Sequence, residues 1–152
     1  MRKHDSALTE ESLDLLFALM HGGRVTEARV DAALAEVHLS SQKWFTLRRI
    51  VEAGGSMSLG QAAERLACAR SNVTQLIDRL EREGLVRRVP DPIDRRSILA
   101  EITEEGRRRY DNGWCALGAL EAVLAATFTP GERDELSRAL GRLDEGLSIE
   151  SE

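Results

Sequence analysis

Residues 70–82 carry side chains that can hydrogen-bond to the edges of DNA bases and to phosphates. These side chains are Arg70, Ser71, Asn72, Thr74, Gln75 and Arg79. Asn and Gln amides can bond adenine through two atoms at once, and Ser or Thr hydroxyls serve several bases. Arginines suit phosphates, which fix the position of a protein on DNA without specifying a sequence. We predict base contacts from at least two of the four uncharged residues, although the same residues would also suit an ordinary solvated helix face.

Apolar residues at helical spacing predict the helix that presents this polar face. Val73, Ile77 and Leu80 recur at i, i+4 and i+7, so they form one stripe that packs inward. Gly84 follows at the position where a helix ends in a left-handed conformation, which glycine adopts without a steric penalty. A shorter helix is expected just before it, opening at residue 58. The two together predict a helix–turn–helix.

The period of the apolar residues then changes from helical to alternating. Short runs at 85–89 and 98–102 predict two antiparallel strands around a loop at 90–96, whose two prolines exclude regular structure. A helix–turn–helix followed by such a hairpin is a winged helix, which places its second helix in the major groove. Arg95 and Arg96 lie at the hairpin tip, where they suit a narrow minor groove or form ordinary solvated loop charges.

The order of motifs in this segment is more specific than any one of them. The patterns LE-x-x-GLV-x-R, DP-x-D-x-R and TE-x-G follow one another within residues 58–106. This segment resembles the DNA-binding lobe of the multiple-antibiotic-resistance regulator (MarR) family of bacterial winged-helix repressors. The matching residues are Val73, Thr74, Leu80, Glu81, Gly84, Leu85, Val86, Arg88, Asp91, Pro92, Asp94, Arg95, Arg96 and Thr103 to Gly106. The resemblance implies that Asp94 supports the wing and holds Arg96 ready for the minor groove.

The rest of the chain predicts helices only. Their apolar residues exceed what a small winged domain can cover, and a symmetric homodimer is the economical explanation. We therefore predict a mostly α fold with a small β-hairpin wing. Residues 40–106 form the winged helix–turn–helix lobe, and residues 1–39 and 107–152 form a helical dimerisation lobe. One long helix is expected to begin at Thr103 and run to Phe128, and the pair Gly22-Gly23 leaves the continuity of the first helix open.

The net charge of −5 is unusual for a protein that binds DNA, so the distribution of the charges matters. Residues 41–96 carry 11 Lys and Arg against 7 Asp and Glu, whereas residues 1–40 and 121–152 together carry 7 against 15. Positive charge is therefore concentrated in the segment that would face phosphates. Local excesses of this size are also common on solvated helices.

Other classes of function find little support in the sequence. It has no glycine-rich phosphate loop, no nucleophile motif and no cluster of metal ligands, so we expect no enzyme, no cofactor and no metal. Cys68 and Cys115 are expected to be inert thiols. No apolar run approaches the ~20 residues of a membrane span, and the first residues lack the apolar stretch of a signal peptide. We expect a cytoplasmic location and no membrane partner.

The resembled family also implies a small, often aromatic and anionic effector. The residues that could line its site between the two lobes are His38, Trp44, Arg48 and Tyr110. Trp44 and Tyr110 could equally belong to the core. Taken together, the sequence predicts a homodimeric regulator that binds double-stranded DNA at an inverted repeat, most simply as a repressor that a ligand releases. The alternative is a winged-helix module that binds protein instead of DNA.

Overall fold

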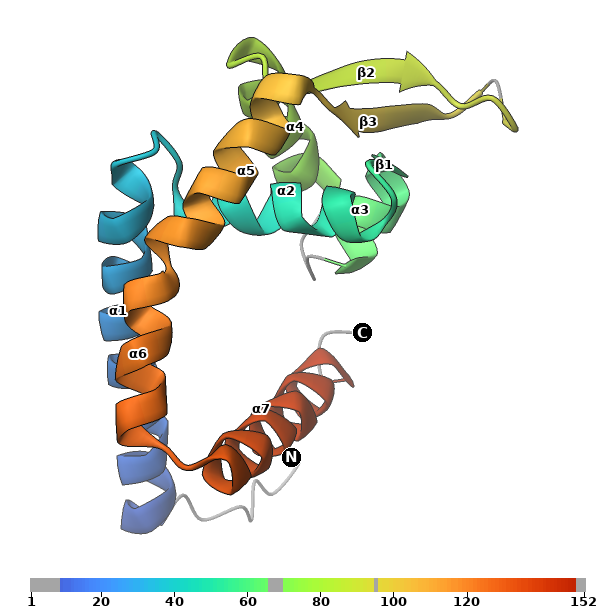
Figure 1. Cartoon of the computed structure of the whole chain (residues 1–152). Helices are drawn as coiled ribbons and strands as arrows, with labels where there is room; N and C mark the ends of the chain where they lie inside the picture. Colours follow the sequence, from blue (N-terminus) through green and yellow to red (C-terminus); the bar gives the residue numbers. More distant parts are fainter. Residues whose placement is uncertain (1–8, 66–69, 95, 150–152) are drawn as a thin grey trace, which may run out of the picture. The chain divides into compact units, whose positions relative to one another are not determined.

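The computed structural model describes residues 9–65, 70–94 and 96–149, without the side chains of residues 65, 70, 71, 148 and 149. The chain divides into two compact units, Met1–Ala116 and Leu117–Glu152. The helices of the first unit are α1 (Glu10–Ala35), α2 (Ser41–Glu52), α3 (Leu59–Arg65), α4 (Arg70–Arg82) and α5 (Glu104–Ala116). Its strands are β1 (Ser56–Ser58), β2 (Val86–Pro90) and β3 (Ile98–Ile102), and Figure 1 shows α4 leading into β2 and the wing. The predicted fold class, mostly α with a winged helix–turn–helix, is confirmed.

The helices begin where the sequence provides capping side chains. The Thr9 hydroxyl accepts a hydrogen bond from the backbone N–H of Ser12 at 3.1 Å, which caps α1. Ser58 and Gln61 exchange hydrogen bonds of 3.0 and 3.1 Å between side chain and backbone, which form a capping box at the predicted start of α3. The open question about α1 is also answered, because the helix continues through the glycine pair to Ala35.

The sheet has one strand more than the sequence predicted. Its order is β1-β3-β2 with both pairings antiparallel, so β3 is the central strand. The predicted hairpin supplies β2 and β3, paired from Val86 with Ile102 to Pro90 with Ile98, so the loop prediction was wrong at Pro90, which is the last residue of β2. The additional strand β1 is only three residues long and pairs Met57 with Ala100. It was missed because so short a run has no alternation to detect, and its pairing with β3 is a long-range contact.

The core of the first unit lies where α2, α4 and the sheet meet. Leu47 and Ile50 of α2, Ile77 and Leu80 of α4, and Ala100 of β3 are all completely buried. Burial of large aliphatic side chains stabilises the fold by roughly 1.5–3 kcal/mol each. This core therefore fixes α4 and the wing on one scaffold.

The second unit contains α6 (Gly118–Thr127) and α7 (Pro130–Ile149). The predicted single helix from Thr103 to Phe128 is thus wrong, because α5 ends at Ala116 and Leu117 lies in a turn. A capping box begins α7, because the Thr129 hydroxyl accepts the N–H of Glu132 at 3.3 Å and Glu132 accepts the N–H of Thr129 at 2.8 Å. Among the described residues, no single helix is long and apolar enough to cross a membrane, and one bent pair passes by length and composition alone.

Candidate nucleic-acid interface

Helix α4 turns its apolar stripe inward and its polar residues outward. Val73 is 1% exposed, whereas Asn72, Gln75 and Arg79 are exposed. Thr74 is also exposed and takes part in an interaction of its own. The backbone of Arg70 and Ser71 belongs to the first turn of α4, while their side chains lie outside the described residues. The helix thus presents four of the six predicted DNA-contacting side chains to solvent, at positions suited to base edges or phosphates.

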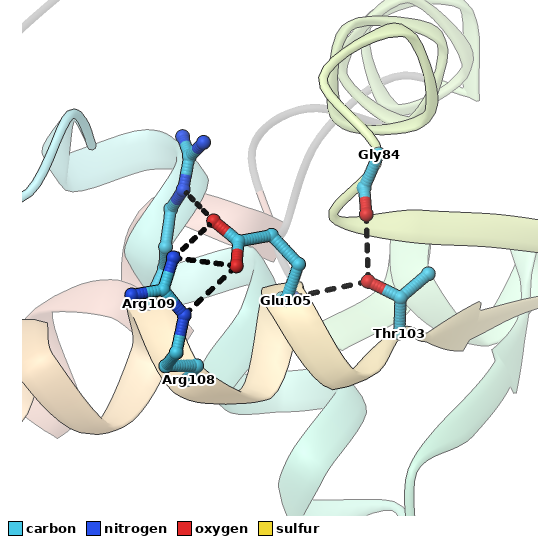
Figure 2. Close-up of polar contacts among 6 residues, drawn as sticks. Gly84, Thr103, Glu105, Arg108 and Arg109 are labelled. Carbon is cyan, nitrogen blue, oxygen red and sulfur yellow. Dashed lines mark hydrogen bonds and ion pairs between the residues drawn. The ribbon is translucent and has the colours of Figure 1, made fainter.

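The C-terminal end of α4 is fastened to the start of α5. Gly84 has a φ of 71°, and the N–H of Leu85 donates to the carbonyl of Leu80 at 2.8 Å. The Thr103 hydroxyl donates to the carbonyl of Gly84 at 2.6 Å and accepts the N–H of Gly106 at 3.0 Å (Figure 2). A carbonyl at the end of the recognition helix and a free N–H at the start of α5 are therefore satisfied by one side chain.

Two aspartates shape the tip of the wing. Asp91 accepts the N–H groups of Ile93 at 2.8 Å and Asp94 at 3.3 Å, and Asp94 accepts the N–H of Arg96 at 3.1 Å. The carboxylate of Asp94 thus holds the backbone of Arg96 and leaves its guanidinium exposed. This is a physical basis for the supporting role predicted for Asp94. Arg95 lies outside the described residues.

The arginines of the winged lobe differ in whether they are already paired. Arg87 pairs with Glu101 on β3, and Arg88 pairs with Asp78 and Glu81 on α4. Within the described part of the chain, Arg79 and Arg96 have no ion-pair partner, so their charges are available to phosphates. The sequence could not show this difference, because these pairings join residues on separate elements.

The four residues predicted for an effector site have different surroundings. Trp44 is 2% exposed, donates from Nε1 to the carbonyl of Tyr110 at 3.1 Å and stacks on the Tyr110 ring at 5.4 Å. Arg48 pairs with Glu52 on its own helix, and His38 is exposed in the turn after α1 with a φ of 57°. The structure therefore brings Trp44 and Tyr110 together as packed groups, and their role toward a ligand stays a prediction.

Two further residues extend this aromatic cluster. Trp114 is 58% exposed with its ring 6.0 Å from that of Trp44, and the Arg107 guanidinium lies 5.9 Å from the centre of the Tyr110 ring. The spacing along α5 could have identified both, since residues three and four positions apart from Tyr110 share its face. Trp114 therefore adds exposed aromatic surface to the cluster. The Arg107 guanidinium, which lies over the Tyr110 ring, also pairs with Asp111.

Glu105 joins two arginines on the first turns of α5. It accepts from Arg109 Nε at 2.7 Å and from Arg108 Nη2 at 2.6 Å, as Figure 2 shows. Hydrogen bonds from Arg109, and next from Arg108, lower the pKa of Glu105 from its ordinary value of 4.5. Ion pairs of a carboxylate with a lowered pKa stabilise the folded state above the unfolded pKa, and this contribution is lost as the pH falls through the folded pKa.

We expect an NMR titration of the Glu105 carboxyl carbon to give a pKa below 4.5 in the wild-type protein. In Arg109→Gln the pKa should rise toward its ordinary value, because the strongest hydrogen bond to the carboxylate loses its positive charge. Arg107→Gln is the matched control, since Arg107 pairs with Asp111 instead. Equal pKa values in all three proteins would contradict the assignment.

The described residues contain no group of three or more His, Cys, Asp or Glu side chains placed to hold a metal ion. Cys115 is an exposed free thiol, and Cys68 lies outside the described residues.

Comparisons with known proteins match this chain to transcriptional regulators. A family model described as the MarR family matches residues 39–98. The transcriptional activatory protein BadR of Rhodopseudomonas palustris is 34% identical over 99 residues, which cover 64% of this chain and 57% of BadR. The chain spans 57% and 60% of the length of two curated relatives at 34% and 33% identity.

Solved structures match over nearly the whole chain. CouR from Rhodococcus jostii RHA1, bound to p-coumaroyl-CoA, has a TM-score of 0.79 and 27% identity, covering 91% of this chain and 95% of CouR. A mutant of MarR from E. coli, complexed with operator DNA, has a TM-score of 0.80 and 21% identity, covering 91% of this chain and 99% of that one. At 21% identity the second likeness shows the fold alone.

Proposed function

Because this chain belongs to the MarR family of transcriptional regulators, which are DNA-binding proteins and not enzymes, we propose that it is a homodimeric repressor of an inverted-repeat operator. One observation carries the proposal. The exposed polar face of α4 and the exposed Arg96 on a shaped wing tip belong to the same lobe. The first suits the major groove and the second the minor groove. Such a regulator would act on DNA in the cytoplasm.

The apolar surface of the helices outside the winged lobe supports the homodimer. In the second unit α6 buries no residue, and Val123, Leu124, Leu140 and Leu147 are between 45% and 60% exposed. In the first unit α1 exposes Leu15, Leu16, Phe17 and Met20. Apolar surfaces of this kind are rare on monomers and mark interfaces. A second copy of the chain would cover them, and its two winged lobes would meet half-sites about 34–36 Å apart.

A small aromatic anion is the effector class that we propose. CouR, at 27% identity, was solved with p-coumaroyl-CoA bound. In the present chain the exposed Trp114 and the half-buried Tyr110 offer aromatic surface. The Arg107 guanidinium lies over the Tyr110 ring while it pairs with Asp111. Trp44 supports these residues from the core. His38 and Arg48 remain candidates for the anionic part of the ligand.

We expect Arg96→Ala to weaken operator binding about tenfold and to lower the slope of log K against log[salt] by about 0.9, because one phosphate-neutralising charge is lost. The measurement is fluorescence anisotropy across a salt series, with the DNA upstream of the protein's own gene and a scrambled duplex. Arg49→Ala is the control, since Arg49 lies on α2 and already pairs with Glu52. A duplex with a single half-site should bind more weakly than the full repeat.

Unchanged affinity and salt slope in Arg96→Ala would contradict a wing contact. If the wild-type protein does not distinguish the upstream DNA from the scrambled duplex, even at low salt, self-regulation is excluded. If other genomic DNA fails as well, the winged-helix module that binds protein becomes the better proposal.

A further inference from the structure

Arg88 of β2 connects the wing to two carboxylates of α4, one helical turn apart. Its Nη2 atom donates to Asp78 at 2.6 Å, and its Nη1 atom donates to Glu81. Its backbone N–H also donates to Glu81, at 3.1 Å. One residue thus holds two carboxylates of α4 that are three positions apart, through three hydrogen bonds.

The geometry of this contact restricts how α4 can move. Charge-assisted hydrogen bonds to a planar guanidinium require a fixed direction as well as a fixed distance. Glu81 is bound through its carboxylate to both the side chain and the backbone of Arg88, so α4 cannot rotate about its axis without breaking these bonds. Only 27% of the Arg88 side chain is exposed, which limits competition from water.

The two carboxylates at this contact are unfavourable for DNA binding, so a structural role would explain their presence on α4. Asp78 and Glu81 are partly exposed carboxylates on the helix that we propose to face DNA, where they would repel phosphates. Arg88 neutralises one of the two charges and is itself unavailable to phosphates. A helix that served only electrostatic attraction would do better with neutral residues at both positions.

We propose that Arg88, with Asp78 and Glu81, is a positioning group that sets the orientation of α4 relative to the wing, so that both engage one duplex in register. This inference rests on the proposed function and adds residues to it that do not touch DNA. Loss of this group of three residues reduces discrimination between operator and random DNA. The attraction between the protein's positive charges and the phosphates stays in place.

The test compares wild type, Arg88→Gln and Glu81→Gln, each confirmed as folded by circular dichroism, on operator and scrambled duplexes across a salt series. We expect Glu81→Gln to lower the affinity ratio of operator to scrambled DNA about tenfold, the equivalent of one charge-assisted hydrogen bond. The salt slope on the operator should not fall. Simple electrostatics predicts the opposite for this variant, namely tighter binding, because a negative charge is removed.

Arg88→Gln separates positioning from a direct phosphate contact. A positioning role lowers the affinity ratio with the salt slope unchanged, whereas a phosphate contact lowers the slope by about 0.9 and weakens both duplexes equally. Arg87→Gln is the matched control, because Arg87 precedes it on β2 and pairs with Glu101 instead of α4.

The outcomes for the two proposals are distinct. If wild type prefers no DNA at all, the proposed function fails. If wild type prefers the operator and Glu81→Gln keeps the full preference, the positioning role of this group is refuted. If Arg88→Gln does not fold, the affinity ratios of Glu81→Gln and Asp78→Asn test the positioning role. Each of these variants keeps Arg88 and removes the charge of one of its partners.

Discussion

Gly106→Ala is expected to destabilise the protein by about 3 kcal/mol or more, which is at the upper end of overpacking effects. A Cβ atom at this position would lie 2.0 Å from the backbone oxygen of Leu85 and 3.0 Å from Cγ1 of Ile102. The Leu85 carbonyl cannot simply move away, because it accepts the N–H of Thr103 at 3.0 Å. The added methyl group must therefore separate α5 from the end of the recognition helix.

The measurement is urea denaturation followed by circular dichroism, with Gly22→Ala as the control. Gly22 also lies within a helix, and a Cβ atom there meets nothing within 4 Å. Replacing it should stabilise α1 by up to about 1 kcal/mol through helix propensity. If both variants unfold at the wild-type denaturant concentration, the tight contact between Gly106 and Leu85 does not exist in solution.

Trp44→Ala is expected to lose about 3–5 kcal/mol of stability, the usual cost of removing a large aromatic side chain from a core. The ring is 2% exposed and is covered by Tyr110 and by α5, which passes so closely at Gly113 that a Cβ atom there would lie 2.5 Å from Trp44 Cδ1. The surrounding backbone cannot collapse into the space that the indole leaves. Thermal and urea unfolding of the variant give the loss.

Trp44→Phe separates packing from hydrogen bonding at the same site. It keeps an aromatic ring against Tyr110 but loses the bond from Nε1 to the Tyr110 carbonyl, so about 1–2 kcal/mol should be lost. Trp114→Ala is the surface comparison, because that ring is 58% exposed and should cost much less. A Trp44→Ala variant as stable as Trp114→Ala would show that Trp44 is not a core residue.

Much of the winged lobe follows from short-range patterns in the sequence. The stripe of Val73, Ile77 and Leu80 predicts which face of α4 is buried, because 3.6 residues per turn place these positions on one side. Ser58 and Gln61 predict the start of α3, since a capping box involves only neighbouring residues. Gly84 predicts the end of α4 for the same reason. The predicted DNA-contacting residues were found in this way and await the binding experiments.

Two features of the fold were not predicted from the sequence, namely strand β1 and the end of α5 at Ala116. Strand β1 exists because β3 offers it a partner more than 40 residues later, and nothing local in Ser56–Ser58 indicates this. The break at Leu117 has no proline or glycine pair to mark it, so the apolar spacing ran on without interruption. The pairing that forms β1 joins residues far apart in the chain, whereas the hydrogen bonds at Leu117 are local, from the N–H groups of Leu120 and Glu121 to the Leu117 carbonyl.

Capping, helical periodicity and motif order depend on neighbouring residues, so they predict the ends and buried faces of the helices in the winged lobe, the chemistry of the α4 face and the resemblance to a family. Which charges are paired and which rings are buried follows from the tertiary structure. Arg88 and Arg96 look alike in the sequence, yet one is held by α4 and the other is exposed at the wing tip. Trp44 and Trp114 differ in the same way, one buried and one exposed. Pairing and burial depend on what folding places opposite each side chain.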